Sequence, residues 1–201
     1  MKAGPAVPGS RTTYVPAERL PGWLERFEAS QGPLEFLPET DGLRVRAVSG
    51  AEARLLGPWP ADGRPGRGAN DIERLTSLAG QARTLGLVLV RRGGYAVGAA
   101  REGRLLASKT GSSNSRRANA ADALAGAAAE QAAAVFSSAA PEYLVFGGDR
   151  MLAGQVAGRR EFARWARLPR LRPLDVADPK AAVLEQAARD AASVFIRVTL
   201  P

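Results

Sequence analysis

Apolar side chains recur at helical spacing near the start of the chain. Between residues 15 and 30 they follow the i, i+3, i+4, i+7 spacing of an amphipathic helix, at Leu20, Trp23, Leu24 and Phe27. This pattern predicts one helix in the stretch. Residues 1–13 show no such spacing, and we expect them to form a loose arm.

Beyond this helix the pattern changes from helical spacing to alternation. Residues 33–60 contain short runs in which apolar and polar side chains alternate, and Asp41-Gly42 supplies the chemistry of a hairpin turn. Such runs are typical of antiparallel strands. Residues 61–70 are rich in Gly and Pro without any period. We therefore expect a small α+β domain over 1–60 and a linker over 61–70.

In the remaining stretch, 71–201, apolar runs alternate with helical patterns. Residues 85–90 are apolar throughout, which is typical of a central strand buried on both faces, and 94–109 has the pattern of a hairpin beside it. Further elements are expected as follows: strands near 142–149, 174–176 and 194–200; helices over 71–84, 116–137 and 161–168; and two helices capped by Asp149 and Asp178. This order favours an α/β fold class, with a mixed sheet covered by helices in one domain over 71–201.

The composition excludes several classes of protein. The chain has no Cys, so disulfide scaffolds and thiol chemistry are excluded, and it has no His, which excludes Ser-His-Asp triads and the usual zinc sites. No run approaches the ~18 apolar residues of a membrane span, and the first residues lack the apolar stretch of a signal peptide. We expect a cytoplasmic protein without a membrane partner.

Arginine dominates the charge of the chain. The 28 Lys and Arg outnumber the 20 Asp and Glu, which gives a net charge of +8. Residues 1–68 hold 9 basic and 8 acidic side chains, whereas 69–201 hold 19 basic and 12 acidic ones. Because the guanidinium fork suits bidentate phosphate contacts, this excess favours a polyanionic partner such as RNA. GC-rich coding, which raises the arginine content everywhere, is the alternative; it explains the preference for Arg over Lys but not the asymmetry between the two parts of the chain.

A short polar stretch between the predicted hairpin and the alanine-rich helix is the main candidate for a site. Gly and Ser let backbone amides approach a ligand closely, and a helix that starts near Arg116 directs its free amides toward this stretch. An ordinary turn, with Asn114 or Ser115 as the helix cap, is the alternative. The candidate residues are Lys109, Gly111, Ser112, Ser113, Asn114, Arg116 and Arg117.

Two further groups of residues carry candidate chemistry. Asp149, Asp175 and Asp178 are expected at strand ends, where they could hold Mg²⁺ as in a nuclease, although two of them serve equally well as helix caps. Residues 159–172 carry arginines around Phe162 and Trp165, and this basic face could contact RNA or be merely solvated. The glycine-rich stretch around 91–103 is predicted as a hairpin, so it fails the structural requirement of a dinucleotide-binding loop.

Several stretches, taken in order, resemble one family. They are "TTYVPAERLPGWLERF", "RLLGPWP", "LGLVLVRRGGYAVGAAREGRLLASKTGS", "RRANAADAL", "VFGGDR" and "LDVADPKAAVL". Together they resemble the actinobacterial Vms-like release-factor family of peptidyl-tRNA hydrolases, which is related to the middle domain of archaeal and eukaryotic class I release factors. The resemblance implies a sheet-and-helix domain like the ribonuclease H fold. It also implies hydrolysis of the ester between a nascent peptide and tRNA on a stalled large ribosomal subunit, without a cofactor or metal.

The chain departs from this family at the polar stretch. The family carries a long glycine-rich loop there, ending in a glutamine that places the attacking water. Residues 109–112 match the start of that loop and 116–119 match the helix after it, so only 113–115 lie between them. We interpret this as a deletion that leaves Asn114 as the nearest counterpart of the catalytic glutamine. The resemblance implies that the other candidate residues of the stretch contact RNA.

The sequence thus leads to one main functional hypothesis and two alternatives. The main hypothesis is a peptidyl-tRNA hydrolase of ribosome rescue whose catalytic loop is shortened, with peptidyl-tRNA and the large ribosomal subunit as partners. The first alternative is a non-catalytic module that binds tRNA or the ribosome. The second is a Mg²⁺-dependent nuclease that uses the three aspartates.

Overall fold

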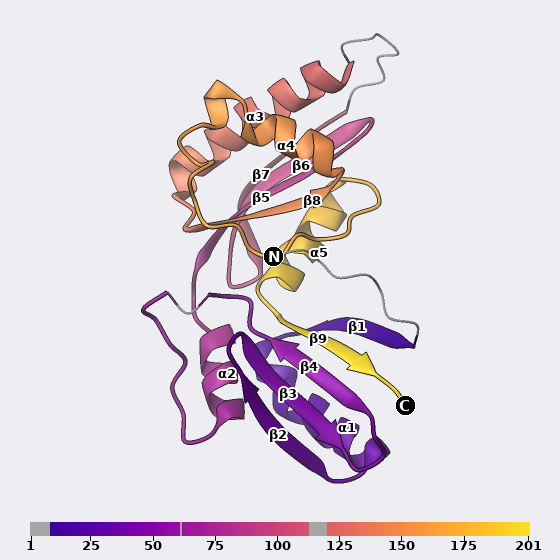
Figure 1. Ribbon diagram of the computed structural model, residues 1–201. Helices are drawn as coiled ribbons and strands as arrows, with labels where there is room; N and C mark the ends of the chain where they lie inside the picture. The colour runs from indigo at the N-terminus through magenta and orange to yellow at the C-terminus, as the bar shows by residue number, and fades with distance from the viewer. Residues whose placement is uncertain (1–8, 61, 113–119) are drawn as a thin grey trace. The chain divides into compact units, whose positions relative to one another are not determined.

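A computed structural model describes residues 9–60, 62–112 and 120–201 (Figure 1). The chain forms two compact units. Unit 1 comprises Met1–Gln81 together with Ser193–Pro201, and unit 2 comprises Ala82–Ala192. The chain therefore leaves unit 1 after Gln81 and returns to it at Ser193. Within the described residues, no helix is both long enough and apolar enough to span a membrane.

Unit 1 is a five-stranded antiparallel sheet in the order β1-β9-β4-β3-β2. Its elements are β1 (Ser10–Val15), η1 (Ala17–Arg19), α1 (Leu20–Gln31), β2 (Leu34–Glu39), β3 (Gly42–Ala47), β4 (Glu52–Leu56), α2 (Asp71–Ala79) and β9 (Val194–Thr199). The alternation in β3 gives the sheet one apolar face, because Leu43, Val45 and Ala47 are buried among residues from α1 and α2. The predicted helix and hairpin of the first domain are confirmed.

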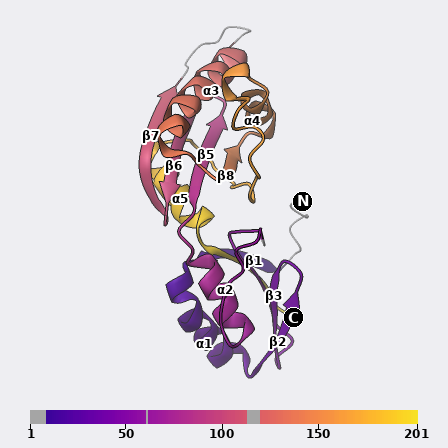
Figure 2. The ribbon, with the colours of Figure 1, turned by 90° about the vertical axis from the view of Figure 1, so that its left-hand side faces the viewer.

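Unit 2 is a four-stranded sheet in the order β7-β6-β5-β8 (Figure 2). Its elements are β5 (Thr84–Arg91), β6 (Gly94–Arg101), β7 (Arg104–Ser112), α3 (Ala120–Ala139), β8 (Tyr143–Gly148), α4 (Arg150–Ala157), η2 (Arg160–Phe162) and α5 (Ala181–Ala191). β5 to β7 form an antiparallel meander, and β8 runs parallel to β5. The apolar run 85–90 is central, as predicted, since it lies between β6 and β8.

Helices cover both faces of this sheet. The side chains of Tyr95 and Val97 lie in the same apolar cluster as α3 and α4. A side chain at Gly98, which points to the opposite face, would meet Leu184 of α5. The predicted fold class, α/β with a mixed sheet covered by helices, is confirmed.

The open edge of β8 is covered by the irregular chain that follows η2. The amide of Leu144 donates to the carbonyl of Pro169, and the amide of Leu171 donates to the carbonyl of Leu144 (2.9 and 2.8 Å). Further along, the amide of Leu174 donates to the carbonyl of Phe146 (3.0 Å). These bonds satisfy backbone groups that an edge strand would leave open.

Six expectations about elements need correction. Residues 174–176 do not form a strand, since only Leu174 makes an isolated bridge, to Gly147. Residues 10–15 form β1 rather than a loose arm, and β9 pairs with β1 and β4, so it belongs to unit 1 and not to the sheet of unit 2. α2 also lies in unit 1 and ends at Ala79. From the sequence, both β9 and α2 were expected in the domain over 71–201. The stretch 161–168 is a short 3-10 turn followed by turns, and Asp178 does not cap α5, which begins at Ala181 with Lys180 in the cap position.

The last two corrections concern short local stretches. Phe162 and Trp165 are the only buried residues of the stretch 161–168, and one pair of anchors three residues apart is compatible with a 3-10 turn as well as with an α-helix. Asp178 lies three residues before Ala181, where α5 begins, so it is not in the cap position; its carboxylate pairs instead with the ammonium group of Lys180 at 2.8 Å.

Candidate functional site

One end of the sheet in unit 2 holds the described residues of the main candidate site. Gly94, at the start of β6, pairs with Ser112, at the end of β7. The turn between β5 and β6 and the carboxyl end of β8 lie at the same end, since Arg91 pairs with Gly94 and Val90 pairs with Gly148. We call this end the loop edge, because the connection 113–119 leaves β7 there. The carboxyl ends of strands in α/β sheets are where ligands commonly bind.

Three of the predicted site residues lie near the carboxyl end of β7, directly before the connection 113–119. Lys109 and Gly111 pair with Val97 and Tyr95, so both lie on the face of the sheet that α3 covers. Lys109 and Ser112 are exposed, and Gly111 is half-buried. The remaining predicted residues, Ser113, Asn114, Arg116 and Arg117, lie outside the described residues.

Gly111 is covered by an aromatic ring. A side chain there would bring its Cβ to 2.5 Å from ring carbons of Tyr95 and 2.6 Å from the phenol oxygen. The ring of Tyr95 is only 8% exposed, and it packs in the cluster beneath α3. Burial, and then the negative charge of Glu130, raises the pKa of the Tyr95 phenol, which therefore stays protonated at neutral pH. Only glycine lets β7 lie this close to the ring.

The loop edge also carries two arginines that the sequence analysis did not single out. Arg91 is the last residue of β5, and Arg92 lies with Gly93 in the tight turn to β6, where Gly93 has φ +101°. The guanidinium of Arg91 donates to the carbonyl of Val176 at 3.1 Å, which anchors it at this edge. Arg92 is exposed and makes no ion pair with any described carboxylate. The sequence could have indicated these two arginines, because the register of the predicted hairpin over 94–109 brings the start of β6, and so the turn before it, next to Gly111 and Ser112.

The start of α3 is tied to the residues that follow α4. Arg159 donates to the backbone carbonyl of Asp122 at 2.8 Å and pairs with its carboxylate. Asp122 lies in the first turn of α3, directly after the connection. The ion pair therefore fixes one side of the loop edge to the arginine-bearing chain beyond α4.

Two of the three aspartates of the nuclease alternative, Asp149 and Asp178, make local contacts, and the third, Asp175, is exposed. The carboxylate of Asp149 accepts from the amides of Met151 and Leu152 at 2.8 and 3.1 Å, as predicted for an N-cap. Asp178 pairs with Lys180, which raises the pKa of that ammonium group through a hydrogen bond and the opposite charge. Among the described residues, no group of three acidic, His or Cys side chains is placed to hold a metal ion.

Comparison with known families gives one match. Residues 114–197 match the sequence model of acVLRF1, described as the actinobacteria/chloroflexi VLRF1 release factor. This confirms the resemblance over that stretch, which is fewer than half of the 201 residues. The match begins inside the connection 113–119 and extends through α3, β8, α4, α5 and most of β9. No curated protein sequence matches the chain.

The comparison with solved structures gives distant likenesses. T. thermophilus RuvC in complex with a Holliday junction substrate shares 13% identity, at a TM-score of 0.38 over 55% of this chain and 90% of RuvC. Archaeoglobus fulgidus Pelota shares 12% identity, at a TM-score of 0.36 over 90% of this chain. A structure described as an archaeal protein shares 11% identity, at a TM-score of 0.41 over 89% of this chain. The chain spans 61% and 63% of the length of the last two.

Proposed function

We propose that the chain is a release-factor-like peptidyl-tRNA hydrolase of ribosome rescue, acting in the cytoplasm on peptides stalled on the large ribosomal subunit. The observation that carries the proposal is the match of residues 114–197 to a release-factor family. The position of the connection 113–119, at an edge that also presents Lys109, Arg91 and Arg92, supports it. Exposed basic side chains around a loop are suited to the phosphates of tRNA.

The reaction is hydrolysis of the ester that joins the peptide to the terminal ribose of tRNA. The oxygen of a water molecule attacks the ester carbonyl, the ribose oxygen leaves with a proton, and the peptide carries the new carboxyl group. In this chain the loop would supply an amide side chain, Asn114, and backbone amides that orient the water. Lys109 and the two arginines of the loop edge would bind the tRNA backbone. Catalysis would then come from positioning rather than from a nucleophilic side chain.

The length of the connection limits this mechanism. Seven residues separate Ser112 from Ala120. Because a returning loop extends for about half its length, its tip reaches roughly 13 Å from the sheet. A loop of about two dozen residues reaches about 40 Å. We therefore propose that this chain binds stalled complexes but releases little peptide, since the amide of Asn114 falls short of the ester.

A second candidate function follows from the same observation. A short connection suits a module that binds tRNA or the ribosome without catalysis. The two candidate functions share the binding surface. They differ in the effect of a longer loop, which should restore peptide release in a hydrolase and should not do so in a non-catalytic module. The nuclease alternative is not proposed further, because Asp149 is occupied as a helix cap.

A release assay on purified large subunits carrying stalled peptidyl-tRNA separates these candidates. We expect the natural chain to co-sediment with the subunits and leave the ester intact. A variant with a long Gly-Gly-x-x-Gln loop between Gly111 and Arg116 should release peptide, whereas Asn114→Gln alone should not. Release by the natural chain would show that the short connection suffices. Binding without release by every variant would favour the non-catalytic module.

A further inference from the structure

The positive charge of the chain is concentrated in one short segment of unit 2. Unit 1 holds 11 basic and 10 acidic residues, and unit 2 holds 17 basic and 10 acidic ones. Residues 159–172, which we call the arginine segment, contain six arginines and a single carboxylate, Glu161. This segment therefore supplies a net charge of +5 out of the +7 carried by unit 2.

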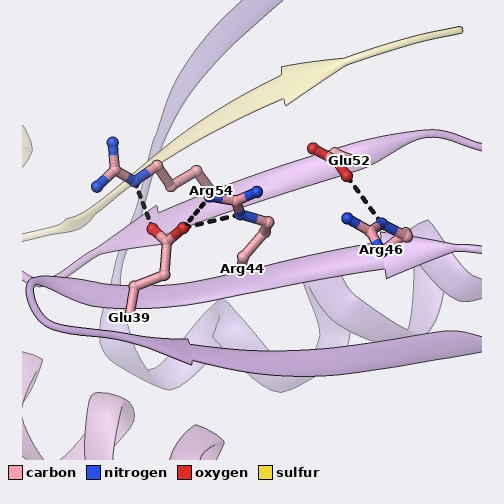
Figure 3. Close-up of polar contacts among 5 residues, drawn as sticks. All are labelled: Glu39, Arg44, Arg46, Glu52 and Arg54. Carbon is pink, nitrogen blue, oxygen red and sulfur yellow. Dashed lines mark hydrogen bonds and ion pairs between the residues drawn. The ribbon is translucent and has the colours of Figure 1, made fainter.

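The arginines of unit 1 are different, because most of those on its sheet are neutralised there. The carboxylate of Glu39 accepts from both Arg44 and Arg54, and Glu52 accepts from Arg46 at 2.8 Å (Figure 3). Burial alone would raise the pKa of Glu39, but the hydrogen bonds from the two arginines hold it below its ordinary value. In unit 1, arginine thus serves cross-strand pairing.

Four arginines of the arginine segment have no carboxylate partner among the described residues. Arg160, Arg164, Arg167 and Arg170 are all exposed. Within the described part of the chain, none of the four makes an ion pair with a carboxylate. Like charges gathered on one segment repel one another, and folding alone gives no reason to place them together. Four exposed arginines without carboxylate partners in the described chain therefore indicate a binding surface for an anion outside the chain.

Aromatic side chains hold this segment in place. Phe162 is fully buried and Trp165 is 9% exposed, and both contact the ring of Phe136 in α3, at centroid distances of 5.9 and 6.1 Å. Their neighbours in sequence are exposed, so the arginines face solvent while the segment stays anchored. The guanidinium of Arg164 lies over the ring of Trp165, which fixes its position further.

The segment follows the length of α3 and ends beside β8. Arg159 contacts Asp122 in the first turn of α3, and Trp165 contacts Phe136 near its other end. These two positions are about 21 Å apart along the helix, at 1.5 Å per residue. Arg170 lies at the start of β8, where its guanidinium covers the ring of Phe146 at 5.0 Å. A row of this length is long enough to contact several successive phosphates of one nucleic-acid strand.

We infer that the arginine segment is a second RNA-contact surface, which binds the sugar–phosphate backbone of RNA along α3, from Arg159 near the loop edge to Arg170 at the opposite end of β8. Arginine suits phosphate because its planar fork makes two parallel hydrogen bonds. A membrane surface fits less well, because no large apolar side chain of 159–172 is exposed for insertion. The choice of RNA rests on the proposed function, whereas the charge argument does not.

The test measures how the affinity for purified deacylated tRNA depends on salt. The variant replaces Arg160, Arg164, Arg167 and Arg170 by Gln. Since each phosphate contact contributes about 0.7 to 0.9 to the slope of log K against log salt, the variant should lose about 3 units of slope. Between 50 and 200 mM salt, the natural chain should lose about 50- to 150-fold more affinity than the variant. The corresponding Lys variant should keep most of the slope.

A control variant removes the same charge from unit 1. It carries Gln at Arg11, Arg19, Arg26 and Arg67, which are all exposed. It should keep the slope of the natural chain. Equal losses in both variants, or an unchanged slope in the segment variant, would overturn the inference. Tighter binding to phosphatidylglycerol vesicles than to tRNA, dependent on the segment, would overturn it in favour of a membrane.

Two further measurements keep the test decisive. If the fourfold variant fails to fold, Arg160→Gln and Arg167→Gln should each still lower the slope by about 1 unit, and no loss in either would count against the inference. Peptide release is measured separately on stalled subunits. If the long-loop Gln variant releases no peptide and the slope depends on the segment, the hydrolase would be overturned but the RNA surface supported; release by that variant with a segment-independent slope would do the reverse.

Discussion

Gly111 gives the sharpest test of how the base of the connection is built. The variant Gly111→Ala would place a methyl group 2.5 Å from ring carbons of Tyr95, far inside contact distance. Because the ring is buried beneath α3, it must shift into its neighbours or β7 must move away. Overpacking of this kind costs about 1–3 kcal/mol, from which replacement of a strand glycine recovers about 0.5–1. Because a contact of 2.5 Å belongs to the costly end of the overpacking range, about 2–3 kcal/mol, the net loss should be about 1–2 kcal/mol.

Thermal unfolding of the full chain measures this loss. For a chain of this size, each kcal/mol lowers the melting temperature by about 2–4 °C, so Gly111→Ala should lower it by about 2–8 °C. Gly126→Ala is the matched control, because Gly126 lies within α3 and a side chain there would meet nothing within 4 Å. That substitution should raise the melting temperature, since alanine is favoured over glycine in a helix by about 1 kcal/mol.

A double-mutant cycle identifies the ring as the cause. In a Tyr95→Leu background the ring is gone, and Gly111→Ala should cost less than about 0.5 kcal/mol. The coupling energy between the two positions should therefore be about 1–2 kcal/mol. If Gly111→Ala were neutral in the natural chain, or equally costly in both backgrounds, the ring would not be what requires glycine at this position.

Three other substitutions test separate contacts. Glu39→Gln should destabilise the chain by up to about 1 kcal/mol at pH 7. Because the pKa of Glu39 is lowered in the folded chain, this loss of stability should be present above the ordinary pKa of a glutamate and disappear as the pH falls from about 5 to 3. Melting curves recorded across that pH range measure it. Asp149→Ala should cost about 1 kcal/mol in chemical denaturation through loss of the cap of α4, while Asp149→Asn should retain stability, and an equal loss in both would argue against capping. Arg92→Gln should reduce the salt slope of tRNA binding by about 1 unit, and an unchanged slope would remove Arg92 from the binding surface.

The pattern along the chain predicted the central elements because their signals are local. The unbroken apolar run of β5 indicates burial on both faces, and the alternation in β3 indicates burial on one. The Asp149 cap was also visible, since it follows a strand and precedes a helical stretch. Each of these depends on residues within one element and its turn.

The errors concern partners that lie far apart in the sequence. β9 alternates, with Val194 and Ile196 buried and Arg197 half-exposed, which is the pattern of a strand covered on one face. That pattern distinguishes it from the fully buried β5, but it does not say that β1, at the other end of the chain, is its partner. Domain bounds drawn along the chain therefore missed that the last strand returns to unit 1.

The candidate site was only partly predictable for a similar reason. Lys109, Gly111 and Ser112 were found because they adjoin a polar stretch between two regular elements. Arg91 and Arg92 reach the same edge through the register of a hairpin, and Arg159 reaches it through an ion pair with Asp122. The spacing of residues 91 and 159 in the sequence does not predict that both lie at the same edge of the sheet.

Release of peptide by two long-loop variants tests the central claim most directly. Both would carry the long loop between Gly111 and Arg116, and they would differ only in whether the loop ends in Gln or in Ala. With stalled peptidyl-tRNA on purified large subunits as substrate, we expect the Gln variant to cleave the ester at least about 100-fold faster, the scale of losing one positioned group. Equal release by both variants, or none by either although both bind the subunits, would contradict the account.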